Sequence, residues 1–187
     1  MSENMAANII SNTFTIDADQ YINSSLRFIM QRQLKSNWCW AATSTSVSYY
    51  YNSNSPWTQC RVACTILHRN DCCNDGDPNL CNVVGKLNEA LTVTGNYVTL
   101  VFGVLSAAKI QAQINAGAVI GARIEWADAT GHFVAIYGIN QINGQYYLNI
   151  ADPIYGNSIL PIDEFANRYQ GRGQWNVSYI TKSVQTF

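Results

Sequence analysis

The order of helix-like and strand-like segments is the feature that most limits the folds open to this chain. Apolar and small residues recur at helical spacing over residues 38–51 and 79–91, whereas the chain after residue 97 is patterned as strands are. Strands are expected at residues 97–102, 118–126, 132–139, 145–152, 158–160 and 175–181, with short helices at 106–115 and 163–169. We therefore predict an α+β fold, in which an N-terminal helical half packs against a C-terminal antiparallel sheet with a cleft between them.

Length and patterning place this fold in one domain. The chain has 187 residues, which is ample for one hydrophobic core and short for two. Residues 1–27 are polar and weakly patterned, so we expect a flexible N-terminal arm there, with an edge strand at residues 13–16 as the alternative. The domain itself is expected over residues 28–187.

Few charges and no long apolar run narrow the classes of partner. The net charge is −1, from 11 basic and 12 acidic residues, so the basic excess of a nucleic-acid-binding protein is missing. No segment reaches the roughly 18 apolar residues that span a bilayer, and the first 30 residues lack the pattern of a Sec signal. Charged residues are only 12% of the chain. We therefore expect neither a nucleic-acid nor a membrane partner. We also expect the protein to be secreted, or delivered into a target cell, without a Sec signal.

Five of the six cysteines lie within 22 residues. Such a cluster favours disulfides, and because five is odd we expect two bridges and one free thiol. Adjacent Cys72 and Cys73 should each pair with another cysteine rather than with each other. The spacings do not follow the paired Cys-x2-Cys pattern of structural zinc, so neither a metal nor another cofactor is expected. The disulfide candidates are Cys60, Cys64, Cys72, Cys73 and Cys81.

The sixth cysteine, Cys39, has a different setting. With Asn37 as the expected N-cap, Cys39 lies in the first turn of a helix, where the helix dipole favours a thiolate. His132 follows Gly131 and opens an apolar strand, so its ring is expected at the rim of the sheet, where a base can meet a nucleophile. Asp152 ends the neighbouring hairpin strand and could orient the histidine. An inert buried cysteine, a core histidine and a turn aspartate are the structural alternatives.

Asn149 competes with Asp152 for the third role. Asn143-Gly144 is a strong signal for a two-residue hairpin turn, and a regular ladder from that turn would put His132 opposite residue 155. Asp152 is three positions from that point and Asn149 is six, and residues three apart point to opposite faces of a strand. Asp152 is nearer along the ladder, and a carboxylate stabilises an imidazolium better than an amide does. We therefore expect Asp152 to orient His132.

A glutamine before Cys39 completes a pattern that resembles a known family. Gln33 lies six residues before Cys39, where a side-chain amide could help the backbone N–H of the nucleophile to stabilise an oxyanion; Gln31 is its competitor. The sequence QLKSNWCWAA at residues 33–42 resembles the nucleophile segment of papain-like cysteine peptidases, and GHFV (131–134) and ADP (151–153) are similar to their base and third-residue segments. The likeness covers roughly residues 28–170 and is greatest to a small bacterial branch with bacteriocin-leader peptidases and a plant-pathogen effector protease.

This resemblance implies a cysteine endopeptidase that works through a thioester. Cys39 would be the nucleophile, His132 the base, Asp152 the orienting residue and Gln33 a member of the oxyanion hole. It also implies an exported bacterial effector or toxin, a protein or peptide substrate with small residues near the scissile bond, and an inhibitor or immunity protein as partner. The alternatives are a leader-processing peptidase, an acyl transferase or glutamine deamidase with the same groups, and a non-catalytic module. The chain departs from the plant and animal enzymes, which carry Cys-Gly-Ser-Cys-Trp at the nucleophile and an asparagine as third residue.

Overall fold

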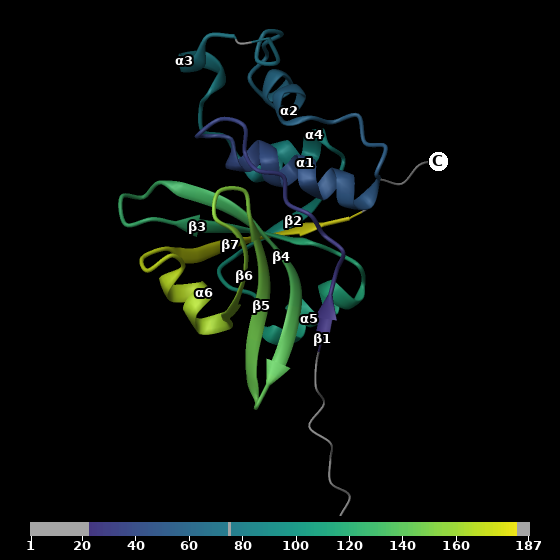
Figure 1. Ribbon diagram of the computed structural model, residues 1–187, viewed down its shortest axis with the longest axis vertical. Helices are drawn as coiled ribbons and strands as arrows, with labels where there is room; N and C mark the ends of the chain where they lie inside the picture. Colours follow the sequence, from purple (N-terminus) through teal and green to yellow (C-terminus); the bar gives the residue numbers. More distant parts are fainter. Residues whose placement is uncertain (1–22, 75, 183–187) are drawn as a thin grey trace, which may run out of the picture.

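The computed structural model describes residues 23–74 and 76–182, which form two layers (Figure 1). The helical layer, at the top of the view, lies against the sheet below it. The predicted α+β arrangement, with helices first and an antiparallel sheet second, is confirmed. The helices of the upper layer are α1 (Cys39–Tyr51), α2 (Gln59–Ile66), α3 (Pro78–Cys81) and α4 (Leu87–Val93); α5 (Ala107–Asn115) and α6 (Ile162–Arg168) lie beside the sheet.

The sheet is antiparallel in each of its ladders, and its strand order is β2-β7-β3-β4-β5-β6. The short β1 pairs with residues 138–140 of β4, just beyond the residues of β4 that pair with β3. Long β4 therefore has β5 on one side and both β3 and β1 on the other. The strands are β1 (Asn23–Ser25), β2 (Tyr97–Phe102), β3 (Ile120–Glu125), β4 (Gly131–Ile142), β5 (Gln145–Asp152), β6 (Gly156–Pro161) and β7 (Gln174–Thr181).

An apolar core lies on each face of the sheet. Successive residues of a strand point to opposite faces, so Phe133 and Ala135 of β4 pack with α1, while Val134 and Ile136 pack toward α5 and α6. Burial on both faces explains why this strand reads as a nearly continuous apolar run in the sequence. The start of β4, where His132 lies, is thereby fixed between the two cores.

The segment expected as an N-terminal arm is ordered over its last residues. Residues 23–25 form β1, and the backbone N–H of Leu26 donates to the carbonyl of Tyr137 at 2.8 Å. The structure thus adds a short strand that the sequence pattern did not predict. The alternative edge strand at residues 13–16 lies outside the described residues, and the domain boundary at residue 28 stays a prediction.

The helix expected over residues 79–91 is wrong as a single element. The structure has two helices, α3 and α4, joined by an extended stretch around residues 82–86. Gly85 explains the break, because a Cβ there would lie 2.5–2.6 Å from carbons of the buried Trp40 ring. The backbone itself must contact the indole, and a continuous helix would not allow this. A further helix, α2, lies in the cysteine-rich segment, where the sequence pattern predicted none.

A β-bulge interrupts the hairpin of β4 and β5. The predicted two-residue turn is present, with Asn143 and Gly144 both at positive φ and Ile142 paired with Gln145. The register then shifts, because Gly138 pairs with Asn149 but Ile136 pairs with Ile150. Tyr137 is the extra residue on β4, and its carbonyl is the one that accepts the N–H of Leu26.

Candidate active site

Cys39 is the first residue of α1, as the sequence predicted. The helix lies deep in the molecule, and Trp40, Ala41 and Ala42 are fully buried while Cys39 itself is 8% exposed. The expected N-cap is wrong by one residue: Trp38 holds that position and makes no side-chain cap hydrogen bond. No acidic residue lies in the first turn. The N-terminal N–H groups of a helix lack intrahelical partners and favour negative charge, so this setting suits a thiolate.

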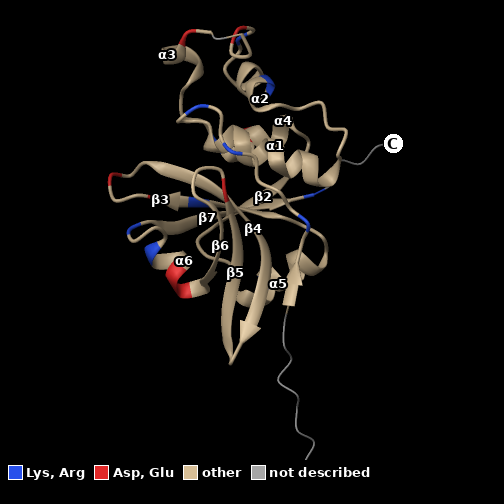
Figure 2. Cartoon of the chain, in the orientation of Figure 1, with Lys and Arg blue, Asp and Glu red and all other residues tan. Residues whose placement is uncertain are grey.

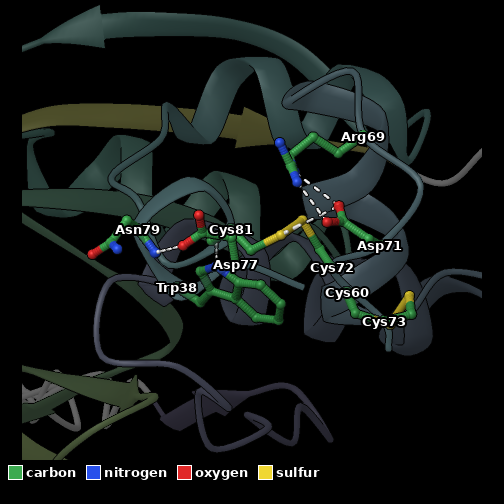
Figure 3. The surroundings of a disulfide bond; sticks show 9 residues. All are labelled: Trp38, Cys60, Arg69, Asp71, Cys72, Cys73, Asp77, Asn79 and Cys81. Carbon is green, nitrogen blue, oxygen red and sulfur yellow. Dashed lines mark hydrogen bonds and ion pairs between the residues drawn. A yellow bond between two sulfur atoms is a disulfide. The ribbon is translucent and has the colours of Figure 1, made fainter. Parts of the chain in front are cut away.

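The turn before Cys39 is tied to residues 81–83. Within this contact the indole N–H of Trp38 donates to the Cys81 carbonyl at 2.7 Å, and that of Trp40 donates to the Val83 carbonyl at 3.2 Å. The side chain of Asn37 donates to the Asn82 carbonyl at 2.8 Å, which is why Asn37 does not cap the helix. Cys81 forms a disulfide with Cys72, and this bridge anchors residues 81–83, which hold the turn before Cys39 (Figure 3).

His132 and Asp152 are direct partners. His132 is the second residue of β4 and Asp152 the last of β5, and His132 Nε2 lies 2.8 Å from Asp152 Oδ2. Both side chains are almost fully buried. Because Nε2 is used in this hydrogen bond, Nδ1 is the ring nitrogen that can exchange a proton with another group.

The bulge at Tyr137 decides which side chain of β5 reaches His132. Residues directly opposite one another in a ladder share a face. Beyond the bulge Ala135 pairs with Ala151, so the next step aligns Val134 with Asp152, and His132 lies on that same face. An unbulged ladder would have put Asn149 there instead. Asn149 actually points away, where it donates to Ser25 Oγ at 3.1 Å and accepts from Asn140 Nδ2 at 2.7 Å.

Asp152 is a buried carboxylate with four hydrogen-bond donors. Its Oδ1 accepts the backbone N–H groups of Ile154 and Tyr155, at 2.6 and 2.9 Å, and its Oδ2 accepts from His132 and from the hydroxyl of Tyr169 at 2.7 Å. Burial alone would raise the pKa of Asp152, but the hydrogen bond and charge of His132 and the two backbone donors bring it below the ordinary value. The group therefore stays ionised in its buried position.

His132 is held as an imidazolium over an extended pH range. Burial lowers its pKa, but the hydrogen bond to Asp152, the charge of Asp152 and the interaction with Cys39 outweigh burial and raise the pKa to about 9. The Trp126 ring stacks near the imidazole, with centroids 6.1 Å apart, and Tyr155 meets it edge-on at 6.2 Å. Sequence reasoning missed Trp126, Tyr155 and Tyr169. Only Tyr155 had a local signal, since an Asp before a turn commonly accepts N–H groups two and three residues later.

Cys39 and His132 line one cavity of about 180 Å³. One wall is formed by Ser36, Asn37, Cys39, Trp40, Val84 and Gly85, and the other by residues at the start of β4 and in the turns next to the strands. The second wall contributes Trp126, Gly131, Phe133, Ile154, Tyr155 and Arg172. A thiol, an imidazole and a buried carboxylate are thus arranged in order at a cleft between the two layers, and acyl transfer by a cysteine nucleophile uses these three kinds of group.

The side-chain amide of Gln33 is hydrogen-bonded to the backbone of the turn before Cys39. Its Nε2 donates to the carbonyls of Lys35 and Ser36, at 2.9 and 2.7 Å, while its Oε1 is buried without a partner among the described residues. Gln33 is also not among the residues that line the cavity. The competitor Gln31 accepts from Gln59 at 3.3 Å. The oxyanion role of Gln33 stays a prediction. In this conformation the two N–H groups of its amide stabilise the turn before Cys39.

The cysteine-rich segment holds two disulfides, Cys60–Cys73 and Cys72–Cys81, and Cys64 is free. The adjacent cysteines pair with other partners, as the sequence predicted. Figure 3 also shows the bidentate ion pair of Arg69 with Asp71 beside the second bridge. Ligand atoms of Asp71, Cys72 and Cys81 lie within 4.8 Å of one another. A metal cannot use this group while both sulfur atoms are bonded to each other, because the ligand form of cysteine is the thiolate.

Comparison with known proteins assigns the family. The profile of the Peptidase_C39 like family matches residues 25–177. The chain belongs to this family. A solved chain from work on the structural basis of antibody cross-reactivity between the mite allergens Blo t 1 and Der p 1 is similar, with a TM-score of 0.56 and 16% identity over 95% of this chain and 75% of that one. No curated protein matches.

Family and fold together make this a papain-like cysteine protease, which binds protein or peptide substrates. The likeness to this solved chain concerns the fold. Among the described residues no helix is long and apolar enough to cross a membrane. Lys and Arg are spread over separate elements of the described chain (Figure 2). The two disulfides are typical of proteins in oxidising surroundings.

Removal of the two disulfides should separate stability from activity. The loops that they close are similar in length, with sequence separations of 9 and 13, so each double alanine variant should lose about 3 kcal/mol of stability. Only Cys72→Ala/Cys81→Ala should also lower the turnover of the folded protease, by about tenfold, because loss of this bridge frees residues 81–83, whose backbone carbonyls accept hydrogen bonds from Trp38 and Trp40 on either side of Cys39.

The matched control is Cys60→Ala/Cys73→Ala, which leaves the Cys72–Cys81 bridge in place. Thermal unfolding would be measured for both variants, and turnover would be compared at a temperature at which each is fully folded. Equal turnover of the two variants would contradict the proposed link between the Cys72–Cys81 bridge and the nucleophile.

Proposed function

We propose that this protease hydrolyses peptide bonds with Cys39 as nucleophile, His132 as general acid and base, and Asp152 as the residue that orients His132. One observation supports this most: Cys39 and His132 share a cavity, and the far nitrogen of His132 is hydrogen-bonded to a buried carboxylate. Cys39, His132 and Asp152 thus each have the role that their surroundings favour.

The reaction begins from a thiolate–imidazolium pair. The Cys39 thiolate attacks the scissile carbonyl carbon, a C–S bond forms, and the carbonyl oxygen becomes an oxyanion. His132 gives its Nδ1 proton to the leaving amine as the C–N bond breaks, which leaves a thioester and a neutral imidazole. Water then attacks the thioester while His132 takes its proton, and the thiolate departs with release of the acid. Asp152 keeps its charge throughout, and its negative charge stabilises the imidazolium at the start and end.

The oxyanion needs hydrogen-bond donors near Cys39. The backbone N–H of Cys39 is suited to this role because it belongs to the first turn of α1 and has no intrahelical acceptor. Gln33 is our second candidate. Its amide would have to release the Lys35 or Ser36 carbonyl to reach the oxyanion, so its contribution depends on a movement of the nucleophile turn when substrate binds.

Cys39→Ala tests the nucleophile. The variant should fold normally, because a short side chain at the start of a helix contributes little packing, but cleavage of a peptide library should fall to the level without enzyme. Iodoacetamide should label Cys39 of the native protein before Cys64, since only Cys39 lies beside an imidazolium. Mass spectrometry would check both results.

Retained cleavage in the alanine variant, or equal labelling of the two thiols, would reject the assignment. The product mass also separates peptidase activity from its alternative. A peptidase yields two fragments whose masses sum to the substrate plus one water, whereas a deamidase with the same groups yields an intact chain heavier by about 1 Da through amide-to-acid exchange.

Asp152→Ala should reduce turnover far more than Asn149→Ala. The first variant removes the charge that stabilises the imidazolium, for an expected loss of about a hundredfold or more. The second only removes contacts that anchor β1 and Asn140, so turnover of the folded protein should stay within about threefold of the wild type. Steady-state kinetics would decide between them, and the reverse order would show that Asn149 is the functional partner of His132.

We further propose that the protease acts outside its producing cell, as a bacterial effector or toxin. Two features support this: the share of charged residues is only 12%, and the helical layer depends on two disulfides that form in oxidising surroundings. Substrates with small residues near the scissile bond fit a cleft whose cavity at Cys39 is about 180 Å³. An inhibitor or immunity protein that covers this cleft belongs to the same proposal.

Expression in candidate target cells tests the effector role. The wild-type protease should slow growth or kill, and Cys39→Ala, produced at the same level, should not, because the harm requires cleavage of a cellular protein. Cell viability and protein level would be followed together. If every plausible target cell tolerates both forms equally while cleavage of peptides persists in vitro, leader processing becomes the better assignment.

A further inference from the structure

Tyr169 is the one partner of Asp152 that comes from outside the β4–β5 region. Its side chain is fully buried, and its hydroxyl donates to Asp152 Oδ2 at 2.7 Å. That oxygen also accepts from His132 Nε2 at 2.8 Å. One carboxylate oxygen therefore receives two side-chain donors, and the direction of the His132 hydrogen bond depends on both.

The position of the Tyr169 ring is fixed on several sides. Tyr169 follows α6 as its C-terminal cap, and its backbone exchanges two hydrogen bonds with Gly173, at 2.9 and 2.8 Å. Its ring packs edge-on against Phe165, with centroids 5.3 Å apart, and stacks near Trp126 at 6.5 Å. Because the ring cannot turn freely, its hydroxyl is a preorganised donor for Asp152.

A fixed donor matters because Asp152 is buried. Burial makes the charged form of a carboxylate unfavourable, and each hydrogen bond to that form lowers its proton affinity. The Tyr169 hydroxyl can serve in this way at any working pH, since burial and the charge of Asp152 raise the pKa of Tyr169 and keep the hydroxyl protonated. Tyr169 does not line the cavity, so its effect must reach the chemistry through Asp152.

We propose that Tyr169 is a positioning residue of this protease, which holds Asp152 Oδ2 toward His132 and keeps Asp152 ionised. The inference rests on the proposed roles of Cys39, His132 and Asp152. It gives α6 a function, because the helix and the turn that follows it place one hydroxyl against the buried carboxylate.

Tyr169→Phe tests the proposal, because it removes the hydroxyl and preserves the ring. Tyr51→Phe is the matched control. Tyr51 is also partly buried, and its hydroxyl is hydrogen-bonded to Thr181 at 2.8 Å and to the backbone N–H of Val119 at 3.2 Å, but it does not line the cavity or touch Asp152. Both variants lose a tyrosine hydroxyl and keep its ring, but only Tyr169→Phe removes a donor from Asp152, so a shift of the pH profile in that variant alone reports on the site.

Each protein would be measured in two ways across pH: peptide cleavage, and the rate at which iodoacetamide alkylates Cys39. For Tyr169→Phe we expect kcat to fall by roughly tenfold with KM unchanged. The acid limb of both profiles should move upward by about one pH unit, because Asp152 would bind a proton more readily. Tyr51→Phe should keep the wild-type profiles. In an Asp152→Ala background, Tyr169→Phe should change the alkylation profile no further.

The outcomes separate this inference from the proposed function. An acid limb that does not move in Tyr169→Phe, or a loss of kcat matched by Tyr51→Phe, would overturn the role of Tyr169 while the peptidase assignment stands. A further shift in the Asp152→Ala background would also overturn it, since Tyr169 would then act by another route. If iodoacetamide alkylates Cys39 of the wild type with an acid limb in the pH profile but the wild type cleaves no peptide, the peptidase proposal fails. The shift of that acid limb in Tyr169→Phe still tests the role of Tyr169.

Discussion

A buried negative charge organises this site. A carboxylate that is almost fully removed from water is stable only when its oxygens accept hydrogen bonds, and Asp152 receives them from His132, Tyr169, Ile154 and Tyr155. These donors come from β4, from the turn after β5 and from the end of α6. The requirement to satisfy one carboxylate therefore links three parts of the chain, and it places the imidazole between that carboxylate and the N-terminus of α1.

The Cys39 side of the cleft is built by a different means. The buried helix α1 fixes Cys39 through small side chains that permit close packing, and the turn before it is held by backbone carbonyls of residues 81–83. That strip has little apolar surface of its own and depends on the Cys72–Cys81 bridge for its place. Disulfides thus hold this part of the helical layer in place, whereas strand pairing holds the sheet. The Cys39 thiol and the His132 imidazole lie where the two layers meet.

Much of this arrangement was visible in the residues alone. The change from helical to strand-like spacing predicted the α+β layout, the Asn143-Gly144 pair predicted the hairpin turn, and the odd cluster of cysteines predicted two bridges and a free thiol. The split of residues 79–91 into α3 and α4 was not visible, because it follows from the contact of Gly85 with the Trp40 ring. The cap at Asn37 failed for a similar reason, since its side chain bonds to Asn82 instead.

The sequence by itself determined the chemical groups and their order along the chain: Cys39 at a helix start, His132 at a strand start and a carboxylate at the next strand's end. Only the tertiary structure decided which residue of β5 meets His132. Asp152 was expected because it lies nearer to His132 along a regular ladder, but such a ladder would have put Asn149, and not Asp152, on the face of His132. The extra residue at Tyr137 shifts the register by one and turns Asp152 to that face. It also brought in Tyr169. The spacing of residues along the chain does not predict a bulge or a contact from a distant helix, because both depend on how the elements pack and on which hydrogen bonds they form with one another.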